Sequence, residues 1–569
     1  MKIRQLSIRN FRGIWELDWS LPARSIFCLV GRGDSTKSTI LEAIRRAFHP
    51  QWNLSFDDAD FYACDHNNSI KIEVVVTDIP DEFRDLARYG YWLSGWNPRS
   101  QTREVDPDEG IEDALCIQLA VKADLEPAWS IIKSGNGEGT PFRTSDRGKA
   151  AVSFIGAFAD RHLTWGRGSI LSELTEGESI TLSLANTARA ERAALEAKRA
   201  EDLKAFDKVA GAAQKTAKDL GVVVTSSYKA HLDIDAINVR LGGLSLHDGE
   251  IPLRQLGLGS KRMLTTGLQT QVLKTPHITL CDEVEIALEP HRIARLVQHL
   301  KQDASGHYFL TTHSPVVLRE MTIDDIQVVH TKAGKTEVVA ASQGALADIA
   351  QGKLRSGAEA FLAPKIVVCE GQTEVGFVRG LDEIWAGQGL LSFAYQGVAP
   401  FNALGADQVR SAAECLHALH YHVAVVVDSD EPRKFSPQDA ADLKSKGMTV
   451  VCWSGNASIE ERAFADLAWV GVLASFRMAV QIHGDEQKII DNVGSKFGAG
   501  FKRDVSTWTD TPQMRTALAK AAKDSGWFKR QSWAQQWVVG ISEHLFSAAI
   551  QSTDLATQIR DLREWVDSV

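Results

Sequence analysis

The chain has 569 residues, 24% of them charged and 44% hydrophobic, which is the balance of a soluble protein long enough for several domains. Its net charge of −10 excludes a globally basic nucleic-acid-binding surface, so any contact with DNA must use local patches. The seven cysteines form no CxxC pair and no zinc spacing, and the longest apolar run is too short to span a bilayer. We therefore expect a cytoplasmic protein of a reducing compartment, without membrane contact.

The N-terminal stretch predicts two strands within residues 1–19 and a third strand at 25–30. A glycine-rich loop, residues 31–39, follows the third strand and precedes a helical pattern. This is the context of a P-loop, in which backbone N–H groups hold phosphates, Lys37 reaches the β/γ-phosphates and Ser38 ligates Mg²⁺. The predicted nucleotide contacts are Gly31, Gly33, Asp34, Ser35, Lys37, Ser38 and Thr39.

The loop departs from the P-loop pattern at Thr36, where the pattern has its second glycine. If this position needs a positive φ, a β-branched residue costs about 1–2 kcal/mol. We therefore expect either weaker nucleotide binding or a differently shaped loop. An ordinary turn remains the alternative, because clusters of Gly, Ser and Thr are common in turns.

The middle of the chain carries weaker signals. Residues 70–145 predict further β structure with insertions, and the basic residues within 161–169 could contact phosphate or simply line a solvated loop. Residues 186–220 are rich in Ala, Glu, Lys and Arg and predict a long exposed helix or helix pair with charges at i,i+4 spacing. We interpret it as an inserted arm for dimerisation; a solvent-facing helix lying on its own domain is the alternative.

Three further motifs follow in an order that resembles an ABC-type ATPase. The LGLGS loop contains Gly259 and Ser260, which in such an enzyme contact the γ-phosphate held by the other subunit. A predicted strand then ends in Asp282 and Glu283, as in a Walker B motif, where Asp282 holds Mg²⁺ through water and Glu283 polarises the attacking water. Another strand ends near His313, in the place of a switch histidine that senses the γ-phosphate.

Two acidic motifs in the C-terminal half each follow a Val/Ile-rich predicted strand. Glu370 ends one strand, with Glu374 past a glycine turn, and Asp428 and Asp430 end the other. Carboxylates gathered within a few ångströms cannot all ionise without cations, and hard oxygen ligands suit Mg²⁺ or Mn²⁺. The sequence therefore predicts a divalent-metal site, with loop decoration as the alternative.

Other C-terminal features are placed around this site. Glu460 opens a helix after the last predicted strand and is the candidate for a second metal position, although Glu is also favoured in first turns. Lys529 is the candidate to stabilise negative charge in the transition state. The basic and aromatic stretch 502–530 predicts a DNA-backbone contact or a solvated helix face. We also expect a strand at 391–395, a loop at 399–406 and a connecting segment at 331–362.

The Glu-Gly-x-Thr-Glu element and the strand ending in Asp-x-Asp resemble the Toprim fold of topoisomerases, primases and certain nucleases. With the ATPase motifs before them, nearly the whole chain resembles the OLD-family (overcoming lysogenisation defect) nucleases. The implied fold class is α/β: an ABC/RecF-like ATPase domain in residues 1–180 and 226–345, interrupted by a helical dimerisation arm at 181–225. A linker at 346–362 and a Toprim domain with C-terminal helices at 363–569 complete the expected organisation.

The resemblance further implies an ATP-binding DNA endonuclease or nickase that uses two Mg²⁺ or Mn²⁺ ions, often in phage defence. It implies a homodimer or higher homo-oligomer, in some members working with a partner helicase. The implied metal ligands are Glu370, Glu374, Asp428, Asp430 and Glu460, with Glu370 as general base and Lys529 as the transition-state lysine. A non-cleaving ATP-gated DNA-binding protein of the RecF type is the main alternative. A topoisomerase or primase is disfavoured, because no tyrosine follows Tyr421 and no zinc module is present.

Overall fold

The computed structural model describes residues 1–133, 139–150, 152–155, isolated positions between 163 and 190, 204–219, 226–228, 245–272, 277–303, 305–342, and 351–568 apart from 353, 355 and 356. The chain divides into two compact units. The first comprises Met1–Ala150, Cys281–Glu285 and Glu289–Val569. The second comprises Ala151–Leu280 and Ile286–Leu288. We describe each unit by itself.

The N-terminal part of the first unit is a mixed β-sheet around a short, completely buried strand, β3 (Ile26–Val30). Such an uninterrupted apolar run is typical of a parallel strand covered on both faces, and β3 indeed pairs in parallel with β14 (Gly306–Thr311) and β15 (Ile326–Lys332). The predicted N-terminal strands are confirmed as β1 (Lys2–Phe11) and β2 (Ile14–Ser20), which form an antiparallel hairpin.

Antiparallel strands extend the sheet on the other side of β1. They are β4 (Ile70–Thr77), β7 (Glu112–Val121), β8 (Pro127–Ile132), β9 (Gly139–Pro141), β5 (Ser94–Asn97) and β6 (Thr102–Glu104). The helix predicted after the P-loop is α1 (Lys37–Ala47), which buries Ile40, Leu41 and Ile44 along one face. Helices α8 (Pro290–Gln302) and α9 (Pro315–Glu320) follow later in the chain.

The prediction that residues 331–362 are only a connecting segment is wrong at its start. Strand β15 continues to Lys332 and pairs in antiparallel fashion with β16 (Lys335–Ala340). The polar stretch is the tip of this hairpin, where Ala333 and Gly334 take positive φ values of 49° and 79°. Two residues with positive φ suit the tight turn between antiparallel strands.

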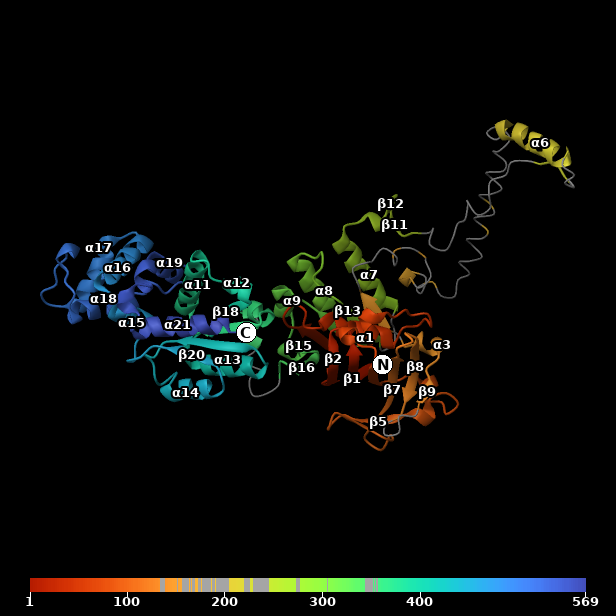
Figure 1. Ribbon diagram of the computed structural model, residues 1–569, viewed down its shortest axis with the longest axis horizontal. Helices are drawn as coiled ribbons and strands as arrows, with labels where there is room; N and C mark the ends of the chain where they lie inside the picture. The colour runs from red at the N-terminus through yellow and green to blue at the C-terminus, as the bar shows by residue number, and fades with distance from the viewer. Residues whose placement is uncertain are drawn as a thin grey trace. The chain divides into compact units, whose positions relative to one another are not determined.

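The C-terminal part of the first unit contains a four-stranded, all-parallel sheet in the order β18-β17-β19-β20 (Figure 1). The strands are β17 (Lys365–Cys369), β18 (Val398–Asn402), β19 (His422–Val427) and β20 (Thr449–Cys452). Three of them are strands that the sequence predicted. The prediction of a strand at 391–395 is wrong, because Phe393–Gln396 is a short helix, α12. The strand β18 lies just after this helix, where a loop was predicted.

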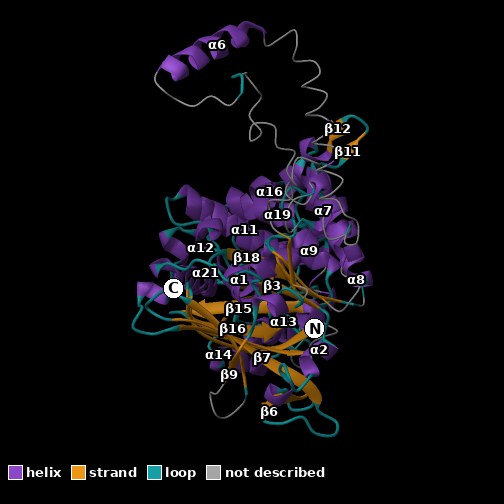
Figure 2. Cartoon of the chain, turned by 90° about the vertical axis from the view of Figure 1, so that its right-hand side faces the viewer, coloured by secondary structure: helices purple, strands orange, loops and turns teal. Residues whose placement is uncertain are grey.

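The helices α11 (Gln372–Gly387), α13 (Ala406–Ala418) and α14 (Pro437–Ser445) connect these strands in turn. After β20 the chain is almost entirely helical. These helices are α15 (Ile459–Asp466), α16 (Trp469–His483), α17 (Glu486–Phe497), α18 (Pro512–Asp524), α19 (Gln531–Gly540), α20 (Ser542–Leu545) and α21 (Asp554–Asp567). Figure 2 shows α16, α19 and α21 of this segment among the purple helices.

A single apolar core joins this sheet to its helices. Trp508, Trp527 and Phe528 belong to this core and are at most 5% exposed. The three aromatic rings are therefore not available for the DNA-backbone contact predicted for residues 502–530, because they are buried in the core. The helices bury them because large aromatic side chains contribute the most apolar area to a core.

The second unit contains β10 (Val152–Ile155), α6 (Lys204–Asp219), the two-stranded β11 (His247–Asp248) and β12 (Ile251–Pro252), α7 (Leu258–Val272) and most of β13 (His277–Cys281). Helix α6 confirms part of the helix predicted within residues 186–220; most of residues 186–203, and most of the basic stretch 161–169, lie outside the described residues. Within the described parts of the chain, no helix is long and apolar enough to cross a membrane.

Candidate functional site

The P-loop wraps around the amino group of Lys37. Its Nζ donates to Gly31 O (3.1 Å), Arg32 O (2.8 Å) and Ser35 Oγ (3.1 Å). Burial lowers the pKa of Lys37 to about 8, and the charge of Asp282 offsets part of this effect. The amino group of Lys37 therefore donates to neutral oxygens of its own loop. A negatively charged phosphate binds an ammonium group more strongly than these oxygens do and can replace them.

Two backbone positions shape this loop. Gly31 has φ +148°, and a Cβ there would lie 2.5 Å from Val329 O, so only glycine is accommodated without a shift. Thr36, the departure from the P-loop pattern, is left-handed with φ 66°, so the position does require a positive φ. Its hydroxyl lies 2.6 Å from Ser35 O, 3.0 Å from Thr331 Oγ1 and 3.2 Å from Thr336 Oγ1. These contacts offset the strain of a β-branched residue in this conformation.

The structure brings the predicted Walker B aspartate to the P-loop. Asp282 Oδ1 accepts from Ser38 Oγ at 2.9 Å and from Thr311 Oγ1 at 2.5 Å. Ser38 is the first exposed side chain of α1, and Asp282 follows β13. A hydroxyl and a carboxylate held together at the start of a helix can share one Mg²⁺ shell beside bound phosphate.

Glu283 and His313 lie next to this pair. The Glu283 N–H donates to Thr311 Oγ1 (2.8 Å), and its φ is 45°, a left-handed value uncommon for glutamate. The sequence interpretation missed Glu285. Its carboxylate accepts from Thr312 Oγ1 (2.8 Å) and from the N–H of His313 (2.6 Å), so it fixes the backbone after β14. Its position two residues beyond Glu283 was the available signal.

Gly259 and Ser260 belong to the second unit and are described separately from the P-loop. Both lie in the first turn of α7 rather than in a loop before it. A Cβ at Gly259 would lie 2.2 Å from Ala287 O, within the same unit. Glycine therefore permits the close approach of the helix start to residues 286–288.

In the C-terminal sheet, Glu370 and Asp428 follow adjacent parallel strands. Strands β17 and β19 pair with Cys369 opposite Val426, and the N–H of Asp428 donates to Glu370 Oε2 at 3.1 Å. Asp428 Oδ1 accepts from Trp453 Nε1 (2.9 Å) and from Ile459 N (3.0 Å). These donors orient the aspartate, and the sequence interpretation did not identify them.

Glu374 and Glu460 are both 4% exposed and complete the carboxylate cluster of Glu370, Glu374, Asp428, Asp430 and Glu460. Glu374 Oε2 accepts from Gly371 N (2.7 Å) at the start of α11, and Glu460 Oε2 accepts from Ser458 Oγ (2.9 Å) at the start of α15. The capping box of α15 uses Glu461, so helix capping does not account for the burial of Glu460.

Burial disfavours ionisation of four members of the cluster, Glu370, Glu374, Asp428 and Glu460. Burial raises the pKa of Glu374 to about 8, and the charge of Glu370 adds to the effect. Burial also raises the pKa of Asp428 well above its usual range, with further contributions from Glu374, Glu460 and Glu370. The pKa values of Glu370 and Glu460 are raised by burial too. Such a group of carboxylates is stabilised by protons or by cations.

Two lysines lie beside the cluster. Lys523 Nζ contacts Asp430 Oδ2 (2.8 Å) and Glu461 Oε2 (2.9 Å); burial lowers its pKa, and these two bonds outweigh burial and raise it. Lys529 is exposed, and its charge acts on Glu460 by lowering the pKa of that carboxyl. The sequence interpretation selected Lys529 and missed Lys523, although Lys523 lies in the same basic stretch.

The donor set fits a hard divalent cation in chemistry, because the cluster consists of buried and half-buried carboxylates, the oxygen ligands that such a cation prefers. Among the described residues, however, no three His, Cys, Asp or Glu side chains stand in a metal-holding arrangement. Glu374 and Glu460 are turned to their own helix starts, and Asp430 is paired with Lys523. Cation binding there requires rotation of these side chains.

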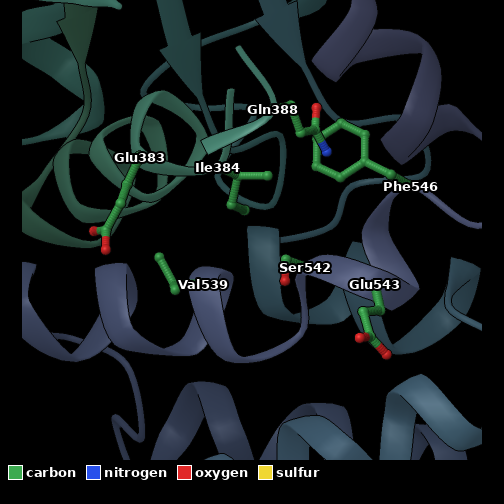
Figure 3. A pocket seen from close by; sticks show the side chains of 7 residues that line it. All are labelled: Glu383, Ile384, Gln388, Val539, Ser542, Glu543 and Phe546. Carbon is green, nitrogen blue, oxygen red and sulfur yellow. The ribbon is translucent and has the colours of Figure 1, made fainter. Parts of the chain in front are cut away.

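A separate open pocket lies at the other end of α11 (Figure 3). Ile384, Val539 and Phe546 form its apolar part, and Glu383 and Glu543 stand on its rim. Ile384 is ten residues beyond Glu374, about 15 Å along the helix. The pocket therefore does not belong to the carboxylate cluster.

Residues 143–319 match the family model described as "AAA domain, putative AbiEii toxin, Type IV TA system". This segment includes Asp282, Glu283 and His313, whose geometry is given above. The chain contains an AAA-type ATPase domain. No curated protein sequence matches the chain significantly.

The solved structures to which this chain is similar are distant from it. The SMC head domain from Thermotoga maritima is 15% identical with TM-score 0.28, and covers 60% of this chain and 99% of its own. The SMC head bound to the C-winged helix domain of ScpA is 13% identical with TM-score 0.32, and covers 60% and 98%. The recombination mediator RecF with ATP is 14% identical with TM-score 0.34, and also covers 60% and 98%. These likenesses carry no argument about function.

Proposed function

We propose that this protein is an ATP-binding, divalent-metal-dependent DNA endonuclease or nickase of the OLD family, in which the C-terminal half is a Toprim domain. The proposal rests above all on one observation: Glu370 and Asp428 lie in contact at the carboxyl ends of adjacent parallel strands, with Glu374 and Glu460 buried beside them. Ligand sites of open α/β sheets lie at this edge. Anti-phage defence, a homo-oligomer and a partner helicase belong to the same proposal.

The residues of the cluster would have defined roles in cleavage. The metal ligands would be the five carboxylates of the cluster, Glu370, Glu374, Asp428, Asp430 and Glu460. Bound Mg²⁺ or Mn²⁺ would lower the pKa of the attacking water and stabilise the leaving oxygen. Glu370 would accept the proton of that water, because burial already raises the pKa of its carboxyl.

The two lysines beside the cluster would bind the negatively charged phosphate of the substrate. Lys529, exposed beside Glu460, would lie against the negative oxygens that form in the transition state. Lys523 would exchange Asp430 for substrate phosphate when the aspartate turns to a cation.

The nucleotide site would serve as a control element. Lys37 would exchange its contacts with Gly31 O and Arg32 O for phosphate oxygens, and Ser38 with Asp282 would share Mg²⁺. Glu283 would polarise the attacking water, and His313 would contact the γ-phosphate. The role of Gly259 and Ser260 would be to complete this site from a second subunit.

The decisive experiment is incubation of the purified full chain with supercoiled plasmid in Mg²⁺ or Mn²⁺. We expect nicked or linear product, lost on chelation and lost in Asp428→Asn, which preserves an acceptor for Trp453 and Ile459. A matched control is Asp382→Asn, since Asp382 lies on α11 away from the cluster and accepts from Phe393 N. If wild-type protein leaves every plasmid intact in both metals, the nuclease proposal fails.

A second candidate is a non-cleaving, ATP-gated DNA-binding protein of the RecF type. It is favoured by the turned-away carboxylates: Glu374 and Glu460 bond to their own helix starts. A mobility shift that depends on ATP, with intact plasmid in both metals, would establish this alternative.

A further inference from the structure

Strand β18 and helix α13 are joined by a three-residue loop, Ala403-Leu404-Gly405, at the carboxyl edge of the parallel sheet. The loop is tied to the cluster through the backbone of Glu370. Gly405 N donates to Glu370 O (2.9 Å), and Ala403 N donates to Cys369 O (2.8 Å). The loop therefore has a fixed position beside the proposed metal ligands.

Leu404, at the centre of this loop, combines two unfavourable properties. Its φ is 68°, in the left-handed region that a branched apolar side chain rarely occupies. Its side chain is also 65% exposed, so burial does not compensate for the strain. The conformation is held by Asn402, whose Oδ1 accepts from Leu404 N at 2.8 Å.

Two other positive-φ positions lie in ordinary turns between antiparallel strands. Leu125 (φ 63°) lies in the turn between β7 and β8, and Ala333 lies in the tip of the β15–β16 hairpin. Leu404 differs because it adjoins a carboxylate cluster and presents an apolar side chain to solvent. Strain that packing does not offset and that lies at a functional edge points to a ligand contact.

We propose that Leu404 is an apolar wedge that contacts the bases of DNA held at the carboxylate cluster and favours an unstacked base step next to the cut phosphate. This inference rests on the proposed nuclease function. Leucine is among the side chains that proteins insert between base pairs, and unstacking brings the backbone out of its regular helical path. Lys434, four residues after Asp430 in the chain, is ion-paired with Glu431, and it would exchange this partner to contact the flanking phosphate.

The test uses Leu404→Asn, because asparagine tolerates the left-handed conformation and removes the apolar side chain. A 2-aminopurine base placed in a short duplex reports unstacking. With Ca²⁺ in place of Mg²⁺, we expect fluorescence to rise on binding of wild-type protein and to rise much less with Leu404→Asn. In Mg²⁺ or Mn²⁺, kcat/KM on a fully paired duplex should fall about tenfold, whereas a duplex mismatched at that step should lose less than about threefold.

Leu390→Asn is the matched control: Leu390 is 45% exposed in the same domain, but it follows the far end of α11. It should resemble wild type in both assays, and the melting temperature of Leu404→Asn should not fall. Equal losses on paired and mismatched DNA, or an unchanged fluorescence signal, would overturn the wedge while leaving the nuclease proposal intact. A change in oligomeric state without a change in the DNA signals would instead assign Leu404 to an interface between copies. Absence of cleavage by wild type in both metals overturns both proposals.

Discussion

The P-loop and the carboxylate cluster are charged sites of the first unit with opposite electrostatic requirements. At the P-loop, one buried ammonium group, Lys37, bonds to neutral oxygens of its own loop, so its charge is satisfied before any ligand arrives. In the cluster, several carboxylates share a buried edge and raise one another's pKa values. Burial lowers the pKa of Lys37 and the charge of Asp282 offsets part of this effect, whereas the cluster is stabilised only by protons, by cations or by turning side chains away.

The largest expected effects come from mutating each of the two sites separately. Lys37→Ala should weaken ATP binding by about 100-fold or more, since it removes a charge-assisted contact to phosphate. Asp428→Asn should leave ATP affinity unchanged within about twofold while it abolishes metal-dependent cleavage. Isothermal titration and the plasmid assay measure the two effects. Equal loss of ATP binding in both variants would show that the sites are not separable.

In the absence of nucleotide, we expect a divalent metal to stabilise the protein by binding at the carboxylate cluster and not at the P-loop. We expect saturating Mn²⁺ without nucleotide to raise the stability of wild-type protein by about 3 kcal/mol at 100 times its dissociation constant. Asp428→Asn should show less than half of this shift, and Lys37→Ala should show all of it. Differential scanning calorimetry with and without Mn²⁺ gives the comparison; a shift that survives in Asp428→Asn would place the ion elsewhere.

Lowering the pH should change the stability contributed by His307 and by Glu374 in opposite directions. His307, buried beside β3, accepts from Ile3 N, and burial lowers its pKa to about 3. The unfolded chain takes up this proton near pH 6.5, so the stability contributed by neutral His307 is present above that pH and declines below it. The loss is about 2 kcal/mol at pH 5.

In metal-free protein, by contrast, Glu374 has a raised pKa of about 8, so lowering the pH from about 8 toward 4.5 removes the cost of its charge. His307→Asn retains an acceptor without a titrating ring. Relative to wild type, it should gain about 2 kcal/mol of stability between pH 7.5 and pH 5, measured by urea unfolding. An unchanged slope would contradict the assignment to His307.

The smallest effect concerns the departure within the P-loop. Thr36→Val keeps the strained backbone and loses the hydroxyl contacts with Thr331 and Thr336, so it should destabilise the protein by about 1–2 kcal/mol. Thr36→Gly relieves the strain while losing the same contacts, and its stability should remain within about 1 kcal/mol of wild type. Chemical denaturation of the pair separates strain from hydrogen bonding. A greater loss in Thr36→Gly than in Thr36→Val would contradict this account.

Local sequence patterns determined the elements that carry chemistry. Buried parallel strands read as uninterrupted apolar runs, so β3, β17 and β19 were predictable, as were the acidic residues that end two of them. The glycine-rich loop before α1 was equally clear. The positive φ of Thr36 was foreseen as a condition of the loop, because glycine patterns report backbone conformation directly.

Only the tertiary structure decided which side chains meet and which face solvent. Burial of Trp527 and Phe528, the pairing of Lys523 with Asp430, and the bonds of Glu285 to residues after β14 join segments far apart in sequence, and local patterns do not encode such contacts. The strand β18 was missed because its short sequence, Val-Ala-Pro-Phe-Asn, contains a proline and lacks the Val/Ile run of its neighbours, and pairing with β17 outweighs its weak local preference. Strand formation depends on the neighbour as much as on the residues themselves, and this is why the edge that holds Leu404 emerged only from the fold.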